Sequence, residues 1–307
     1  MPKRKFPNGD LYKEHKTRYE LGESIWDLAA EVDMRYSPYR KMAQAERWRR
    51  PEQPRINSSD KPRYVSPPKF KGEQLIFTDA QIPFHNATFI NECIDLALAW
   101  GIKSCIGAGD IFDVTAFAAP KYHVKPQDTF GAELSEGRKF VKAIADVFEF
   151  HLITGNHEKR FRHFLNEQLA AEEFRLLLKA PENVTTSDYG YCLVENWVIA
   201  HPRNVSVIPG RIPFFVSRKY PFFNIACGHG HVQAITSAED GKRIVIDIGS
   251  CADFSKLDWV AMDITTRPAM VNGALILRRS SATKKLLPVL LWDWTDFDTL
   301  AKLGPSI

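Results

Sequence analysis

The sequence predicts an α/β fold built on two packed sheets, together with a small all-helical module at the N-terminus. From Gly72 onward, short apolar runs typical of buried strands alternate with helical patterns. Repeated β-α-β units of this kind form a largely parallel sheet covered by helices. Beyond His231 the pattern changes to strands separated by turns, which predicts a second sheet packed on the first.

Residues 1–50 are expected to form the helical module. Residues 11–21 have the composition of a polar helix, and Ser24 is a suitable N-cap for a second helix with an apolar stripe. Ser37 and Pro38 are a favourable N-cap and first-turn pair for a third helix. The module is therefore expected to contain three short helices.

The stretch RYELGESIWDLAAEVDMRYSPYRKM (residues 18–42) resembles the helix-turn-helix of resolvases, transposases and homeodomain-like regulators. In those proteins the second helix of the pair enters the major groove of DNA. The turn here differs because it lacks the usual glycine. The alternative is a helical hairpin that packs on the main domain with its basic face in solvent. The resemblance predicts DNA contacts from Arg40, Lys41, Arg47, Arg49 and Arg50.

A proline-rich stretch separates this module from the rest of the chain. Residues 51–70 contain five prolines and few aliphatic side chains, which is typical of a semi-extended linker. The predicted organisation is a helical module at residues 1–50, a linker at residues 51–71 and a main domain at residues 72–307.

The composition is that of an ordinary globular protein, with 44% hydrophobic and 25% charged residues among 307. The net charge of +4 permits a nucleic-acid partner without requiring one. The five cysteines never occur as CxxC, which favours free thiols in a reducing compartment. No apolar region follows the basic start, and no apolar run is long enough to cross a bilayer. A cytoplasmic protein without a membrane partner is expected.

Five segments share one layout, in which an apolar run ends at a polar side chain. They are LIFTDAQ (residues 75–81), CIGAGDIFD (105–113), HLITGNHE (151–158), WVIAH (197–201) and IACGHGH (225–231). Open α/β sheets build their sites at the carboxyl ends of strands. The resulting mixture of oxygen and nitrogen ligands suits Mn²⁺, Fe or Zn²⁺. A binuclear metal site is therefore predicted from Asp79, Asp110, Asn156, His201, His229 and His231.

Each block also has a structural interpretation when it is taken singly. GDxxD is a common capped turn, and a histidine such as His201 after a strand is commonly a hydrogen-bonded structural residue. Structural turns do not explain why all five blocks place their polar residues at strand ends. The shared placement favours the metal site.

The order D-x-(H/Q), GDxxD, GNHE, H and GHxH resembles the calcineurin-like metallophosphoesterase family over about residues 72–250. The resemblance implies a metallophosphoesterase-type two-sheet β-sandwich flanked by helices. It also implies that His157 is the general acid, that Asp113 fixes its loop, and that Glu158 orients the neighbouring backbone or His157. For the metals, it implies Asp79 and His231 at one ion, Asn156, His201 and His229 at the other, and Asp110 as the bridge.

Gln81 departs from the family pattern, since many members have a histidine at its position. An amide oxygen is a harder and weaker ligand than imidazole, so this site should favour Mn²⁺ or Mg²⁺ over Zn²⁺. The expected cofactors are two divalent ions, foremost Mn²⁺, with Mg²⁺, Fe or Zn²⁺ as alternatives. Two such ions can orient a phosphate and generate a hydroxide nucleophile near neutral pH.

Three features favour DNA as the substrate. Two of them are the N-terminal module that resembles DNA-binding helices and the basic linker, while the lack in GDIFDVT of the Arg-Gly that continues this motif in phosphoprotein phosphatases weighs against a phosphoprotein substrate. Basic residues also follow GNHE: Lys159, Arg160 and Arg162 are predicted to steer a phosphodiester backbone, although a solvated helix face is the alternative.

The favoured function is hydrolysis of DNA phosphodiester bonds by a metal-dependent nuclease. The chain is similar to metallophosphoesterases often encoded by bacteriophages, which would place it in the host cytoplasm. It is more distantly similar to the exonuclease subunits of double-strand-break repair complexes. The alternatives are a phosphatase or phosphodiesterase of small nucleotides, and a non-catalytic DNA-binding accessory protein that reuses the fold.

Overall fold

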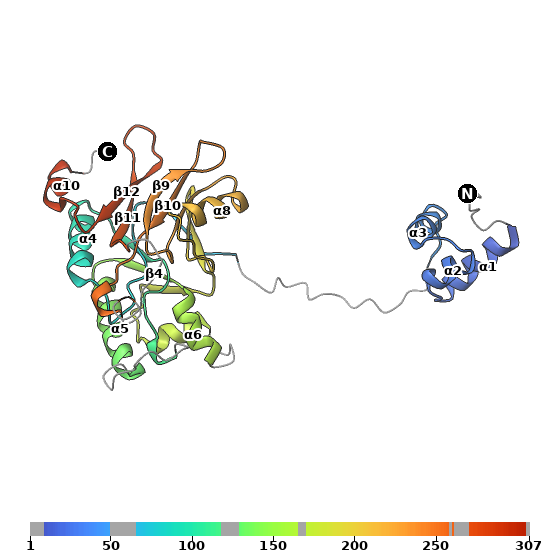
Figure 1. Ribbon diagram of the computed structural model, residues 1–307, viewed down its shortest axis with the longest axis horizontal. Coiled ribbons are helices and arrows are strands. Elements are labelled where there is room, and N and C mark those ends of the chain that lie inside the picture. The colour runs from blue at the N-terminus through green and yellow to red at the C-terminus, as the bar shows by residue number, and fades with distance from the viewer. Residues whose placement is uncertain are drawn as a thin grey trace. The chain divides into compact units, whose positions relative to one another are not determined.

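The computed structural model describes residues 9–49, 66–117, 129–164, 170–257, 260 and 270–304, without the side chains of residues 162 and 164. The chain divides into two compact units, Met1–Val65 and Ser66–Ile307. Figure 1 draws both, and each is described by itself below. Residues 50–65, which include Arg50 and most of the predicted linker, lie outside the described residues.

The N-terminal unit contains the three expected helices, α1 (Gly9–Glu20), α2 (Ile25–Glu31) and α3 (Tyr36–Ala45). The Ser24 side chain accepts a hydrogen bond from the Trp26 amide and caps α2, as the sequence predicts. The expected start of α3 is wrong, because the helix begins at Tyr36 and its N-cap, Arg35, makes no side-chain cap. Proline is compatible with any position in the first helical turn, where no amide partner is lost. A small core holds the unit together: Ile25, Leu28, Ala29, Tyr39, Ala43 and Trp48.

The second unit is built on two six-stranded sheets. The first has the order β12-β11-β2-β3-β4-β5. Its central strands β2 to β5 run parallel, whereas β11 is antiparallel to both β2 and β12. The strands are β2 (Gln74–Phe77), β3 (Ser104–Gly107), β4 (Glu149–Ile153), β5 (Val184–Ser187), β11 (Gly273–Arg279) and β12 (Leu286–Trp292).

The second sheet has the order β1-β6-β7-β8-β10-β9. Strands β7, β8 and β10 run parallel, while β6 and β9 are antiparallel to their neighbours β7 and β10. The strands are β1 (Lys69–Phe70), β6 (Tyr191–Val194), β7 (Trp197–Ala200), β8 (Asn224–Cys227), β9 (Gln233–Ser237) and β10 (Ile244–Ile248).

The C-terminal strands are distributed differently from the prediction. Only β9 and β10 join the second sheet after His231, whereas β11 and β12 extend the first. Six of the seven residues of β11 are buried, so this strand needs cover on both faces and pairs with the open edge of β2. The sequence pattern also predicts a strand at about residues 259–265 (WVAMDIT), and this segment lies mostly outside the described residues.

Period-two alternation along the strands explains how the layers pack. In β2, Ile76 belongs to the cluster between the two sheets, while its neighbours Leu75 and Phe77 pack under helices. Burying such a side chain stabilises the fold by about 1.5–3 kcal/mol. The helices are α4 (Ala87–Ala99), α5 (Phe130–Ala145), α6 (Asn156–Phe164), α7 (Ala171–Leu177), α8 (Arg211–Lys219) and α10 (Phe297–Leu303), with short turns η1 (Thr115–Phe117) and η2 (Phe254–Lys256).

The α/β fold with two sheets and covering helices is thus confirmed. The sequence pattern of residues 158–179 predicts one helix, whereas the structure has two, α6 and α7, and residues 165–169 between them lie outside the described residues. All five cysteines are buried and free. Among the helices that the structure describes, none has the length and apolarity needed to cross a membrane.

Candidate metal centre

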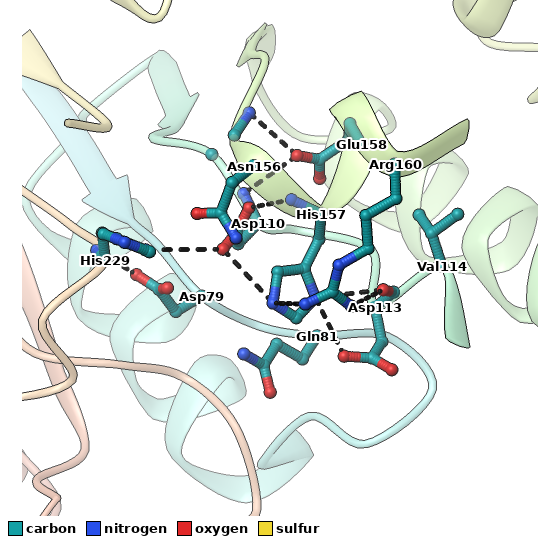
Figure 2. A network of polar contacts seen from close by, with 12 residues as sticks. Asp79, Gln81, Asp110, Asp113, Val114, Asn156, His157, Glu158, Arg160 and His229 are labelled. Atoms are coloured by element: carbon teal, nitrogen blue, oxygen red, sulfur yellow. Dashed lines mark hydrogen bonds and ion pairs between the residues drawn. The ribbon is translucent and has the colours of Figure 1, made fainter. Parts of the chain in front are cut away.

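The fold brings the predicted ligands to one edge because they follow parallel strands. In the first sheet, Asp79, Asp110 and Asn156 come shortly after the ends of β2, β3 and β4. In the second sheet, His201 and His229 follow β7 and β8. The carboxyl ends of parallel strands meet at the same edge, and Figure 2 shows Asp79, Asp110, Asn156 and His229 gathered there.

The backbone at this edge is strained. Five candidate ligands have left-handed φ angles: Asp79 (51°), Gln81 (50°), Asp110 (51°), His229 (79°) and His231 (55°). Such a conformation costs a non-glycine residue about 1–3 kcal/mol, and it clusters at functional sites. The chain therefore turns sharply after β2, β3 and β8.

Asp110 lies at the centre of the cluster. Its Oδ1 atom accepts a hydrogen bond from the His157 amide at 2.8 Å. Its Oδ2 atom is buried and makes no hydrogen bond. Three ring nitrogens surround Oδ2: His201 Nε2 at 3.2 Å, His157 Nε2 at 3.6 Å and His229 Nδ1 at 3.9 Å. An unsatisfied buried carboxylate oxygen among imidazoles is the arrangement that a bound cation would satisfy.

His201 presents a lone pair to this centre. Its Nδ1 lies 2.9 Å from the Ala108 carbonyl, and donating to that oxygen leaves Nε2 without a proton in the neutral ring. Nε2 then faces two acceptors, Asp110 Oδ2 at 3.2 Å and Asn156 Oδ1 at 3.1 Å. Three lone pairs directed at one another require a positive charge between them. In the metal-free protein a proton can supply it: burial lowers the pKa of His201, but Asp110 and Asp79 outweigh burial and raise it to about 9.

A second group of ligands surrounds Asp79. Its Oδ1 atom is 3.0 Å from His231 Nε2, and its Oδ2 accepts from Thr78 Oγ1 at 2.6 Å and the His229 amide at 2.8 Å. Gln81 Nε2 lies 3.4 Å from His231 Nε2, while Gln81 Oε1 is buried without a hydrogen-bond partner. That free amide oxygen fits the predicted role of Gln81 as an oxygen ligand.

The donor set fits divalent ions. One ligand atom from each of Asp79, Asp110, His201 and His229 lies within 4.8 Å of the others. Burial and the neighbouring His201 lower the pKa of His229 to about 4, so its ring is neutral and able to bind metal. Burial raises the pKa of Asp110, but His201 and His157 outweigh it and hold this carboxyl well below its ordinary pKa. The carboxylate is therefore ionised.

His157 lies beside Asp110 and points toward a second carboxylate. Its Nδ1 is 3.0 Å from Asp113 Oδ1. Burial lowers the pKa of His157, but Asp110 and Asp113 outweigh burial and raise it to about 9. Arg160 Nη2 lies 2.9 Å from His157 Nε2, a contact suited only to the neutral ring. The two carboxylates are more deeply buried than the Arg160 side chain, so we favour the protonated ring, from which Arg160 would turn away.

Two carboxylates have supporting roles. Asp113 was expected only to fix its loop, yet its carboxylate also pairs with His157. In the sequence, this pairing is indicated only by the position of Asp113 as the second aspartate of the GDxxD motif. Glu158 accepts hydrogen bonds from the amides of Asp110 at 3.1 Å, Phe112 at 3.0 Å and Gly155 at 2.8 Å. It thereby ties the Asp110 loop to α6.

The basic residues predicted to contact substrate or DNA lie on α6 or in the N-terminal unit. Arg160, on α6, also donates to the Asp113 carbonyl at 3.2 Å. Lys159 lies on the same helix, and the side chain of Arg162 is not among those described. In the N-terminal unit, the structure leaves four predicted DNA contacts exposed: Arg40, Lys41, Arg47 and Arg49.

No family model matches the chain, and no curated protein matches it. Solved structures with a similar fold include Vps29 from Chaetomium thermophilum, at 10% identity and a TM-score of 0.38, covering 72% of this chain and 94% of that one. The E. coli phosphoesterase Yfce matches at 10% identity and a TM-score of 0.34, covering 72% and 98%. Vps29 from Entamoeba histolytica, in complex with zinc, matches at 11% identity and a TM-score of 0.34, with the same coverage.

Proposed function

We propose that this protein is a phosphodiesterase of the calcineurin-like metallophosphoesterase kind that uses two divalent metal ions. The observation that carries the proposal is the buried Oδ2 atom of Asp110, which makes no hydrogen bond and faces three imidazoles. One ion would be held by Asp79, Gln81, Asp110 and His231. The other would be held by Asp110, Asn156, His201 and His229.

The side chains around the ions have distinct tasks. Two divalent ions at this position would supply charge neutralisation and would activate a water for attack on phosphorus. His157 holds a proton at Nε2, beside Asp110, and donates it to the leaving oxygen as general acid. Asp113 holds the opposite ring nitrogen, so the imidazole keeps its orientation during proton transfer. Glu158 keeps the two ligand-bearing loops in register through three backbone amides.

The charges of the N-terminal unit favour DNA as the substrate. In the N-terminal unit, none of the ion pairs between described residues involves Arg35, Arg40 or Lys41, so these charges are available to phosphates. The carboxylates of Glu23 and Glu31 are instead paired with Arg18. A basic helix without its own acidic partners suits the groove of a duplex. Mn²⁺ is the proposed ion, since Gln81 and the carboxylates add hard oxygen ligands.

A comparison of substrates tests this proposal. With added Mn²⁺, the protein should hydrolyse bis-p-nitrophenyl phosphate faster than p-nitrophenyl phosphate, and it should degrade single- or double-stranded DNA. Asp110→Asn should abolish both activities. Preference for the monoester would instead indicate a phosphatase of small nucleotides. DNA binding without hydrolysis of any substrate would indicate a non-catalytic accessory protein.

A further inference from the structure

The segment between the candidate ligand His201 and strand β8 has an unusual charge composition. Residues 202–223 (PRNVSVIPGRIPFFVSRKYPFF) contain four basic residues and no aspartate or glutamate. The segment comprises a loop at residues 202–210, helix α8 and the short connection to β8. We call it the α8 surface.

Topology places one end of the α8 surface beside the metal centre. Strands β7 and β8 are parallel neighbours, so α8 returns the chain from the carboxyl edge of the sheet to the opposite edge. Arg211, at the start of α8, is therefore at the edge that carries His201 and His229. The loop before it is fastened to β10, because the Gly210 amide donates to Asp247 Oδ2 at 2.6 Å. Helix α8 packs on β8 and β10, and Figure 1 shows it beside β10.

Aromatic side chains and cations alternate along this surface. Phe215 is 44% exposed, and Phe222, beyond the end of α8, is 86% exposed. The Arg211 guanidinium lies 5.8 Å and that of Arg218 5.2 Å from the centre of the Phe215 ring. Val207 and Ile208 of the loop are also exposed. Large aromatic rings left in solvent beside cations are typical of surfaces on which nucleobases stack.

The charges of the α8 surface are largely unpaired within the described residues. Arg218 pairs with Glu239 at 3.0 Å. Among the described carboxylates, none forms an ion pair with Arg203, Arg211 or Lys219. Since the segment contributes no acidic side chain of its own, its charge is positive throughout, and the surface attracts polyanions.

We propose that the α8 surface binds single-stranded nucleic acid and leads its backbone to the metal centre. The proposal rests on the phosphodiesterase function proposed above and specifies its substrate. Phosphates contact Arg203, Arg211 and Lys219, while unstacked bases lie against Phe215 and Phe222. A duplex offers its bases only at groove edges, whereas a single strand can turn each base onto an aromatic ring.

Binding of a fluorescent oligothymidylate of about ten nucleotides to the full-length protein tests the proposal. A chelator is present, so hydrolysis does not occur, and anisotropy is measured at several salt concentrations. Phe222→Ala should raise the Kd about fivefold or more, since stacking of one base contributes that much. Lys219→Glu should also raise the Kd and should lower the salt slope by about 0.7 for each phosphate that the variant no longer neutralises. Both residues are exposed, so folding should survive, and thermal melts check it.

Matched controls come from the other sheet. Trp294 is 68% exposed and follows β12, and Lys285, also exposed, comes directly before β12. Trp294→Ala and Lys285→Glu should change the Kd by less than about twofold. If Phe222→Ala and Lys219→Glu bind the oligonucleotide as the controls do, the proposal is overturned. Weaker binding of these two variants to vesicles of anionic phospholipid, with oligonucleotide binding retained, would also overturn it and identify a membrane-facing surface.

A separate measurement distinguishes this proposal from the phosphodiesterase function. Mn²⁺-dependent hydrolysis of bis-p-nitrophenyl phosphate reports on the metal centre, since this small diester cannot span the length of α8. Hydrolysis together with unaltered oligonucleotide binding in the variants would refute the α8 surface alone. If the variants bind the oligonucleotide more weakly but the unmodified protein hydrolyses no diester, only the phosphodiesterase function is refuted.

Discussion

At the scale of single residues, the candidate centre is defined by buried oxygen and nitrogen lone pairs that point at one another. Asp110 Oδ2 and Gln81 Oε1 are buried and make no hydrogen bond. His201 Nε2 faces two oxygen acceptors within 3.2 Å. Leaving such groups unsatisfied costs about 1–3 kcal/mol each, which cations would recover on binding. The site should therefore be more stable with metal than without it.

Replacing Gln81 tests whether its side chain binds the metal ion that Asp79 and His231 would also hold. Gln81→His should tighten binding of one Mn²⁺ equivalent and shift preference toward Zn²⁺, because imidazole is the softer and stronger ligand. Isothermal titration of the metal-free protein gives both affinities. Gln81→Ala is the control and should weaken the same step. If neither variant alters either affinity, Gln81 is not a ligand.

Asp113 should set the pH at which His157, the proposed general acid, loses its proton. Its carboxylate helps to raise the pKa of His157 to about 9, so activity should fall as the pH rises through that value. Asp113→Asn removes one charge that raises the pKa, and this falling limb of the kcat profile should move to lower pH. His157→Ala is the comparison: it should lower kcat by about 10²–10⁴ while metal content, measured by elemental analysis, persists. An unshifted limb in Asp113→Asn would refute the pairing.

At the scale of elements, backbone segments from different strands and helices approach one another very closely around the candidate centre. Gly155, between β4 and α6, is the clearest case, since a Cβ added there would lie 2.2 Å from Asp110 Oδ1 and 2.3 Å from the Asp110 amide nitrogen. Glu158 then draws the first turn of α6 onto the Asp110 loop. The position of one aspartate thus depends on the join between two elements.

A side chain at residue 155 should push these elements apart. Gly155→Ala should destabilise the protein by about 1–3 kcal/mol, because the atoms it meets include backbone that cannot rotate away. Denaturant unfolding measures this destabilisation, and metal titration should show weaker binding. Gly131→Ala in α5 is the matched control: its nearest neighbour would be 4.0 Å away, and helical alanine should be neutral or stabilising. Equal stability of the two variants would contradict the close approach.

At the scale of the whole molecule, two compact units separate two proposed tasks. The metal centre lies entirely within Ser66–Ile307, and the helix-turn-helix-like basic residues lie within Met1–Val65. The N-terminal unit has its own aromatic core, in which the buried His15 ring lies 3.2 Å from Glu31. Each unit can therefore be altered without dismantling the core of the other.

Removal of the N-terminal module should affect DNA but not small substrates. A protein lacking residues 1–50 should bind duplex DNA more weakly and with a smaller salt slope, because α3 and the residues after it no longer neutralise phosphates. Hydrolysis of bis-p-nitrophenyl phosphate provides the control and should be retained. Unchanged affinity and salt slope for duplex DNA would show that the module is not a DNA-binding element.

The sequence by itself determined the composition of the candidate centre. Apolar runs of four or five residues ending in Asp79, Asp110, Asn156, His201 or His229 mark strand ends, and parallel strands must bring those ends to one edge. Local periodicity likewise predicted the helices of the N-terminal unit and the two-sheet α/β class. These features depend on neighbours in the chain, which a sequence records directly.

Only the tertiary structure decided how those pieces meet. The pairing of β11 with β2, the contact of His157 with Asp113 and the tautomer of His201 all involve residues far apart in the chain. The same is true of the α8 surface, whose nearness to the metal centre follows from a crossover between parallel strands. Such contacts depend on which faces remain open after the sheets assemble. The local sequence pattern cannot predict these contacts, because they depend on how the assembled sheets and helices pack.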